Sequence, residues 1–127
     1  MDLVLWISYP QAQVIHNSKS RFNRNLQIYE TEHDYGRQFI IPEEGYGRID
    51  LLVKDVDNGD IIVIELKKGK SDDEVIKQIS RYMGWVKKNI AKNKENVRGI
   101  ICVYKADDKL INSVAINPMM ELFEYSS

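Results

Sequence analysis

The stretch Gly47-Arg-Ile-Asp-Leu-Leu52, followed after a turn by Ile61-Ile-Val-Ile-Glu-Leu-Lys-Lys68, decides the fold of this chain. Both segments are rich in aliphatic and β-branched residues, which favour strands. Between them lies Asp57-Asn-Gly-Asp60, and Asn-Gly tolerates the positive φ angles of a two-residue type I′ turn. The sequence therefore predicts an antiparallel hairpin with strands at 48–54 and 61–67.

Three charged residues of this hairpin are expected on one face of the sheet. With a two-residue loop, Asp50 lies opposite Lys67 and Leu52 opposite Glu65, and opposed residues of an antiparallel pair share a face. Glu65 and Lys67 also share that face because they are two residues apart. Any loop of even length keeps the three together, whereas an odd loop without a bulge would turn Asp50 away.

Two carboxylates and a lysine on one face suit metal-dependent hydrolysis of a phosphodiester. Asp50 and Glu65 offer the oxygen ligands that Mg²⁺ or Mn²⁺ prefers, and the main-chain carbonyl of Leu66 is a further candidate ligand. Lys67 is expected to hold or deprotonate an attacking water and to balance the developing charge. The structural alternative is an ion-pair cluster on a solvated sheet face, which is the commoner arrangement in an arbitrary hairpin.

The sequence after the hairpin predicts a helix and a parallel strand. Ser71-Asp-Asp-Glu74 has the pattern of a capping box with Ser71 as the N-cap, and apolar residues keep helical spacing as far as Ile90. A strand is expected at 97–104, parallel to the strand at 61–67, because a long helix connects the two.

Three shorter elements complete an α/β fold with a mixed sheet. Gln38–Ile41 is expected as a strand that ends at Pro42. A short helix is expected at 107–113, and a strand at the edge of the sheet at 120–125.

One stripe of the predicted helix carries Gln78, Tyr82 and Trp85, at spacings of four and three residues. Gln78 could hydrogen-bond a phosphate or a metal-bound water. Tyr82 and Trp85 could stack on a base or line a cleft. An aromatic stripe is more often part of the core, so both interpretations stay open for Trp85.

Together these motifs resemble the PD-(D/E)xK nuclease superfamily, in particular the catalytic domain of NucS-like (EndoMS-like) DNA endonucleases. The resemblance runs from about residue 26 to 125, and Gln78-Ile-Ser-Arg-Tyr-Met-Gly-Trp-Val86 adds to the two strands. It implies a restriction-endonuclease-like α/β fold, with a mixed β-sheet and a long crossover helix, and Mg²⁺-dependent cleavage of DNA. The resemblance implies that Asp50 and Glu65 are metal ligands and that Lys67 is the catalytic lysine. It also implies that Gln78 and Tyr82 form the helix motif and that Arg48 contacts a phosphate.

Such enzymes usually carry a further acidic residue on an N-terminal helix. Residues 1–25 contain only Asp2, with no clear helical pattern, so they are expected to form an N-terminal arm that precedes a nuclease-like domain at 26–127. The alternative function is a catalytically inactive module of the same fold that binds nucleic acid or a protein partner. A homodimer formed through Leu3–Ile7 and the last strand is a third option.

The charges are unevenly distributed along the chain. Residues 67–98 contain ten Lys and Arg and four Asp and Glu, a net charge of +6, although the whole chain has a formal net charge of −1. A basic segment of this kind could form one face toward the phosphates of DNA. The alternative is that most of these lysines only solvate the outside of a helix.

Length and composition fit one soluble domain. The chain has 127 residues, of which 43% are hydrophobic and 29% charged. No apolar run approaches the roughly 20 residues that a membrane span needs, and Met1–Ser8 is a poor signal peptide. The single cysteine, Cys102, lies in an apolar segment and is expected to be buried. These features predict a cytoplasmic protein without an internal disulfide.

Overall fold

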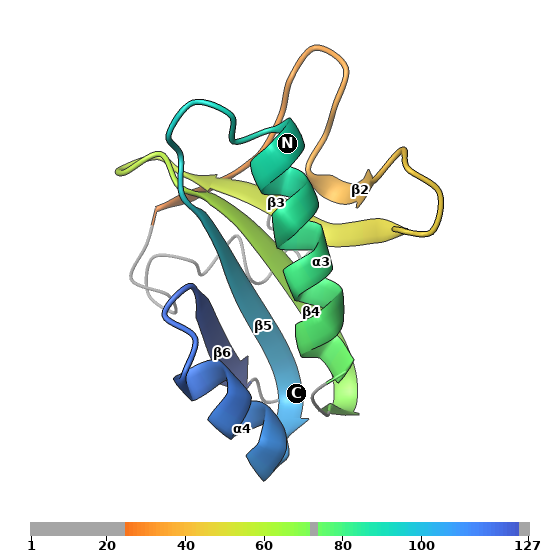
Figure 1. The fold of residues 1–127 in the computed structure, drawn as a ribbon, viewed down its shortest axis with the longest axis vertical. Coiled ribbons are helices and arrows are strands. Elements are labelled where there is room, and N and C mark those ends of the chain that lie inside the picture. Colours follow the sequence, from red (N-terminus) through yellow and green to blue (C-terminus); the bar gives the residue numbers. More distant parts are fainter. Residues whose placement is uncertain (1–24, 72–73, 125–127) are drawn as a thin grey trace, which may run out of the picture.

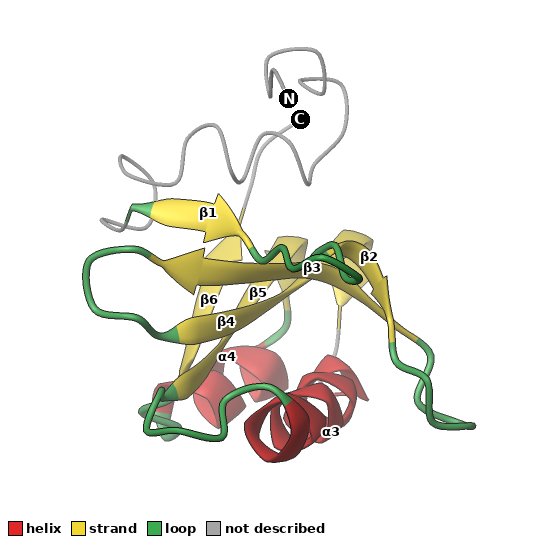
Figure 2. Ribbon diagram, turned by 90° about the horizontal axis from the view of Figure 1, so that it is seen from above, coloured by secondary structure: helices red, strands yellow, loops and turns green. Residues whose placement is uncertain are grey.

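The computed structural model describes residues 25–71 and 74–124 of the chain. In these residues a six-stranded sheet is covered on one side by two helices (Figures 1 and 2). The strands in chain order are β1 (Leu26–Ile28), β2 (Arg37–Ile40), β3 (Arg48–Asp55), β4 (Ile61–Ser71), β5 (Val97–Ala106) and β6 (Met120–Glu124). The mixed α/β class predicted from the sequence is confirmed.

The sheet combines antiparallel and parallel pairing around the predicted hairpin. Strand β3 pairs antiparallel with β1, β2 and β4, and β5 and β6 continue the sheet from β4 as parallel neighbours. Helix α3 (Glu74–Asn89) connects β4 to β5, and α4 (Asp108–Ala115) connects β5 to β6. The predicted parallel pairing across the long helix is therefore confirmed, with β6 as the predicted edge strand.

The two faces of the sheet are both apolar, and alternation along β4 decides which residues reach the helices. Ile61 and Val63 belong to the cluster that contains α3 and α4 residues, whereas Ile62 and Ile64 belong to the cluster on the other face. Glu65 continues the first series and therefore faces α3. Cys102 lies in the second cluster and is buried, as expected.

Helix α3 packs on the sheet through an amphipathic stripe. Its buried side chains are Val75, Ile79, Tyr82, Trp85 and Val86. Figure 1 shows the helix lying across the sheet over β3, β4 and β5. Within the described parts of the chain, neither helix is long and apolar enough to cross a membrane.

The turn between β3 and β4 differs from the predicted type I′ turn. Lys54 pairs with Ile61, and the N–H of Asp55 donates to the carbonyl of Asp60, which leaves a four-residue loop. Two side chains bind the loop backbone, because Asp55 accepts from the N–H of residue 57 and Asn58 accepts from that of residue 60. These side-chain contacts favour the wider loop.

The wider loop shifts the register by two residues and leaves the faces unchanged. The predicted pairing of Leu52 with Glu65 is wrong, because Leu52 lies opposite Val63. A shift of two keeps every side chain on its face, since the loop still has an even number of residues. The predicted pairing of Asp50 with Lys67 is wrong for the same reason.

Several element boundaries also differ. Ser71 is not an N-cap: it is the last residue of β4, where it pairs with Ala106 of the neighbouring strand, and α3 begins at Glu74. Strand β1 was not predicted, because three residues are too few to show alternation. The arm expected at 1–25, including Leu3–Ile7, lies almost wholly outside the described residues.

Gly36 holds the β1–β2 connection against the middle of β3. Its N–H donates to the carbonyl of Tyr29, and its own carbonyl accepts from the N–H of Leu52. A Cβ at Gly36 would lie 2.1 Å from the carbonyl oxygen of Leu52, which belongs to the backbone and cannot move aside. The connection therefore contacts β3 at Leu52, which is two positions after Asp50 in the chain.

We expect Gly36→Ala to lower the free energy of unfolding by about 3 kcal/mol, because the added methyl group overlaps main-chain atoms. Urea unfolding followed by circular dichroism measures the change. Gly84→Ala is the matched control, since a Cβ there meets nothing within 4 Å and alanine favours the helix by about 0.5–1 kcal/mol. Equal stability of Gly36→Ala and the wild type would contradict the expectation.

Candidate functional site

Asp50 lies where the regular pairing of β3 with β4 ends. The paired residues run from Lys54 back to Leu51, which lies opposite Ile64, and continuing that register by one residue would set Asp50 against Glu65. The Oδ2 atom of Asp50 accepts a hydrogen bond of 2.9 Å from the N–H of Leu66. The carboxyl group is thus fixed against the backbone of β4 beside Glu65.

Glu65 is a buried carboxylic acid in the middle of the sheet. Its exposed fraction is 1%, and it lies on β4 between β3 and β5, where it pairs with Ile101. Its Oε1 atom has no hydrogen-bond partner among the described residues. A buried oxygen without a donor is costly, and an added cation or proton would remove that cost.

Burial raises the pKa of Glu65 to about 9. The loss of hydration is the largest cause, followed by the negative charge of Asp50 and by a hydrogen bond between the two carboxyl groups. The positive charge of Lys67 acts in the opposite direction and lowers the pKa. Glu65 therefore keeps its proton at neutral pH, and a metal ion would have to displace that proton.

Lys67 is held by a chain of hydrogen bonds that reaches from the sheet to the helix. Its Nζ atom donates to Oε1 of Gln78 at 2.9 Å, and Nε2 of Gln78 donates to the hydroxyl of Tyr82 at 3.1 Å. The predicted helix motif therefore contacts the predicted catalytic lysine. Because Glu65 and Lys67 occupy alternate positions of β4, both face α3 with Asp50 beside them.

The two other predicted site residues lie close to this group. In an extended strand the N–H and C=O of one residue point to the same side of the strand. The N–H of Leu66 points toward Asp50 on β3, so the carbonyl of Leu66 is expected on that side of β4 as well. Arg48 is exposed at the start of β3, two residues before Asp50. Its exposed position suits a contact with a bound ligand.

Tyr82 and Trp85 are part of the core. Their exposed fractions are 2% and 9%, and the Trp85 ring packs against Phe39 with 5.8 Å between ring centroids. The indole N–H of Trp85 donates to the carboxylate of Glu43. This burial supports the core interpretation of the stripe and argues against stacking of either ring on a base.

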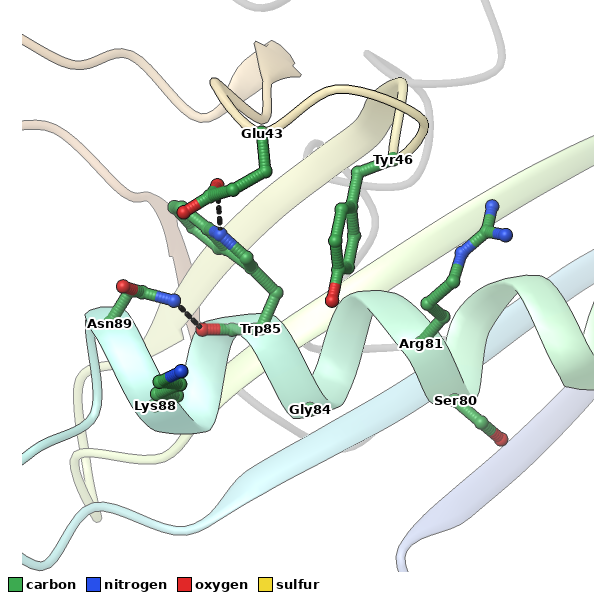
Figure 3. Close-up of a pocket in the computed structure, with 8 residues that line it drawn as sticks. All are labelled: Glu43, Tyr46, Ser80, Arg81, Gly84, Trp85, Lys88 and Asn89. Carbon is green, nitrogen blue, oxygen red and sulfur yellow. Dashed lines mark hydrogen bonds between the residues drawn. The ribbon is translucent and has the colours of Figure 1, made fainter.

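A pocket of about 340 Å³ lies beside Trp85, between the loop after β2 and the outer face of α3 (Figure 3). The Arg81 guanidinium lies over the rings of Tyr46 and Tyr82, 5.8 and 5.9 Å from their centroids. Neither Tyr46 nor Arg81 is among the site residues predicted from the sequence. Arg81 and Lys88 are seven residues apart on the helix, which was an available signal, but the loop residue Tyr46 had none.

The carboxylate pair offers two side-chain ligands to a divalent cation. Within residues 25–71 and 74–124, no group of three His, Cys, Asp or Glu side chains is placed to hold a metal ion. Mg²⁺ is commonly held by one or two carboxylates together with water and substrate phosphates, so Asp50 and Glu65 are a sufficient protein contribution. Asp2, which is the only acidic residue among residues 1–25, lies outside the described ranges.

The mixed sheet with helices on one side defines an α/β fold of the kind found in DNA repair endonucleases. A repair endonuclease from Pyrococcus abyssi superposes with a TM-score of 0.67 at 23% identity, covering 94% of this chain and 46% of its own. An EndoMS structure in complex with double-stranded DNA gives 0.65 at 16% identity, covering 95% and 45%. At these identities the similarity establishes the fold, and the chain spans less than half the length of each.

Residues 24–115 match the family described as the endonuclease NucS C-terminal domain, so the chain belongs to that family. A search of curated proteins gave no match. The sequence resemblance to NucS-like endonucleases is thereby confirmed at the level of this domain.

We expect the stability of the metal-free protein to fall as pH rises from about 5 to about 9. The folded-state pKa of Glu65 is raised from 4.5 to about 9, so the folded state keeps a proton that the unfolded state loses. The contribution of this proton to the free energy of unfolding is fully present below the ordinary pKa of a glutamate and is lost as pH approaches 9. Between these values the free energy of unfolding falls by up to about 1.4 kcal/mol per pH unit.

Urea unfolding in EDTA at a series of pH values measures this slope. Glu65→Gln should flatten it because the amide does not titrate, whereas the exposed Glu44→Gln should keep the wild-type slope. Parallel pH profiles for wild type and Glu65→Gln would show that Glu65 is ionised in the folded protein.

Proposed function

We propose that this chain is the catalytic domain of a metal-dependent DNA endonuclease of the PD-(D/E)xK type, with a restriction-endonuclease-like arrangement of its sheet and helices. One observation carries the proposal. The buried carboxyl group of Glu65 has an oxygen without a hydrogen-bond donor, and Asp50 and Lys67 lie beside it. A divalent cation at this place would bind both carboxylates.

A purely structural cluster explains this arrangement less well. A buried carboxylic acid beside a second carboxylate raises the free energy of the folded state, and an apolar residue at position 65 would continue the strand. Groups whose pKa is strongly shifted by burial and by a neighbouring charge are concentrated at functional sites. Membership in the NucS family supports the same conclusion.

The residues divide the proposed work between them. Asp50, Glu65 and the carbonyl of Leu66 would hold Mg²⁺ or Mn²⁺, which when bound supplies Lewis-acid polarisation of a phosphate and a lower pKa for water. The N–H of Leu66 keeps the Asp50 carboxylate in place. Glu65 would have to lose its proton in order to serve as a ligand.

Lys67 would orient the attacking water and offset negative charge on the phosphate. Its hydrogen bond to Gln78 fixes the position of the amine, and Tyr82 in turn fixes the amide of Gln78. Arg48, exposed near Asp50, would contact a neighbouring phosphate. DNA as the substrate is supported by the family and by the basic segment from residue 67 to 98.

We expect Mn²⁺ and Mg²⁺ to raise the melting temperature of the wild-type chain, because a ligand that binds only the folded state stabilises it. The stabilisation should grow as pH rises through 7 to 9, since binding displaces the proton on Glu65. Asp50→Asn and Glu65→Gln should abolish the shift, which differential scanning fluorimetry measures. Glu44→Gln, which changes an exposed carboxylate, should keep it. An equal shift in all four proteins would place the ion elsewhere.

We expect Lys67→Ala to lower the rate of DNA cleavage by about 100-fold or more, because a positioned acid–base group typically contributes that much. Single-stranded, branched and duplex DNA are incubated with the protein and either metal, and products are resolved on denaturing gels. The variant should keep its metal-dependent melting shift. If the folded wild-type chain cuts none of these DNAs, the chain is a non-catalytic module of the nuclease fold.

A further inference from the structure

We propose that the pocket between the β2–β3 loop and α3 holds the phosphodiester backbone of the DNA strand that enters the proposed metal site. This inference rests on the proposed nuclease function and assigns a second contact region to its substrate. The pocket residues that carry it are Glu43, Tyr46, Arg81, Gly84, Trp85 and Lys88. Figure 3 shows the loop residues above the helix and the helix residues forming the opposite side.

Side-chain contacts along α3 connect the site on the sheet with the pocket. Lys67 donates to Gln78, Gln78 donates to Tyr82, and the Arg81 guanidinium lies over the Tyr82 ring. A strand bound at the carboxylates would therefore meet Arg81 next, on the adjoining turn of α3.

Two cations of α3 are spaced for successive phosphates. Arg81 and Lys88 are exposed and lie seven residues apart, so they share one face with an axial separation of about 10 Å. One strand of duplex DNA carries a phosphate about every 3.4 Å of axis, so the distance spans a few nucleotides. Contacts of this kind position a strand without reading its sequence.

Arg81 is oriented in advance by aromatic rings. Its guanidinium lies over Tyr46 from the loop and over Tyr82 from its own helix. These contacts restrict a long side chain and leave its planar donors available to a phosphate. An exposed arginine that only solvated the helix would not need two rings to hold it.

Gly84 provides the open space between the two cations. It is exposed on α3, and a Cβ at this position would meet nothing within 4 Å. Glycine weakens a helix, and here no packing contact requires it. A strand backbone can therefore approach the helix closely at this position.

Glu43 is the acidic residue of the pocket, and its carboxylate would repel a bound phosphate. Its carboxylate accepts from the indole N–H of Trp85, which moderates its charge without removing it. If phosphates bind here, this carboxylate opposes them. Glu43→Gln, which keeps an oxygen acceptor for Trp85, should therefore strengthen DNA binding.

The test measures binding of a short fluorescein-labelled duplex by anisotropy in EDTA over a series of salt concentrations, so that no cleavage occurs. Each phosphate contact adds about 0.9 to the slope of log K against log salt. Arg81→Gln and Lys88→Gln should each lower the slope by about one and weaken binding about 10-fold at low salt. Lys87→Gln is the matched control, because the Lys87 amine bonds the carbonyl of Glu95 instead of lining the pocket.

Gly84 allows the pocket to be blocked without unfolding the chain. Gly84→Glu should weaken binding at least 10-fold by placing a negative side chain in the open space, and Gly84→Ala should bind within twofold of the wild type. Circular dichroism spectra and urea midpoints confirm that each variant is folded. Glu43→Gln should bind at least twofold more tightly.

The pocket proposal is overturned if Arg81→Gln and Lys88→Gln bind like Lys87→Gln, or if the wild-type chain shows no salt-dependent binding. Cleavage with Mn²⁺ is measured separately on the wild type. Cleavage without an effect of the pocket variants on binding rejects the pocket alone. A pocket effect on binding without any cleavage rejects the nuclease function and keeps the pocket as a DNA contact.

Discussion

The burial of one carboxylic acid on β4 is the constraint around which the rest of this structure is arranged. Glu65 is 1% exposed and follows the aliphatic residues Ile61 and Val63 on the helix-facing side of β4. Removing its charge from water is unfavourable, and the neighbouring carboxylate of Asp50 increases the cost. A proton or a cation offsets both the lost hydration of Glu65 and its repulsion by Asp50. The buried carboxyl group that destabilises the metal-free fold is therefore also the group proposed to bind a divalent metal.

The face of the sheet on which the site lies could be predicted from sequence, whereas its register could not. Alternation along a strand has a period of two, so an even loop of any length places Asp50, Glu65 and Lys67 together. The actual loop has four residues because Asp55 and Asn58 bind its backbone. That correction places Asp50 one residue beyond the last pair of β3 and β4, Leu51 with Ile64, and so beside Glu65. The sequence-based register makes the two residues diagonal neighbours.

Helix α3 shows the other limit of reasoning from sequence. Its amphipathic pattern predicts the packed face, but the sequence also predicts Ser71 as the N-cap, whereas Ser71 pairs with Ala106 at the end of β4. Pairing between distant strands leaves no local signal in the sequence. Tyr82 and Trp85 lie in the core, and Tyr82 still serves the site through its hydroxyl, which accepts from Gln78. The pocket beside Trp85 depends on a loop more than 30 residues away in sequence, so no pattern within the helix could reveal it.

Anomalous diffraction from crystals of the chain grown with Mn²⁺ decides whether Asp50 and Glu65 bind a metal ion. We expect a single strong peak between the two carboxylates, at metal–oxygen distances of about 2.1 Å, with the carbonyl of Leu66 directed toward it. Crystals at pH 8 that show no peak between the two carboxyl groups would contradict a metal-dependent nuclease centre at this site.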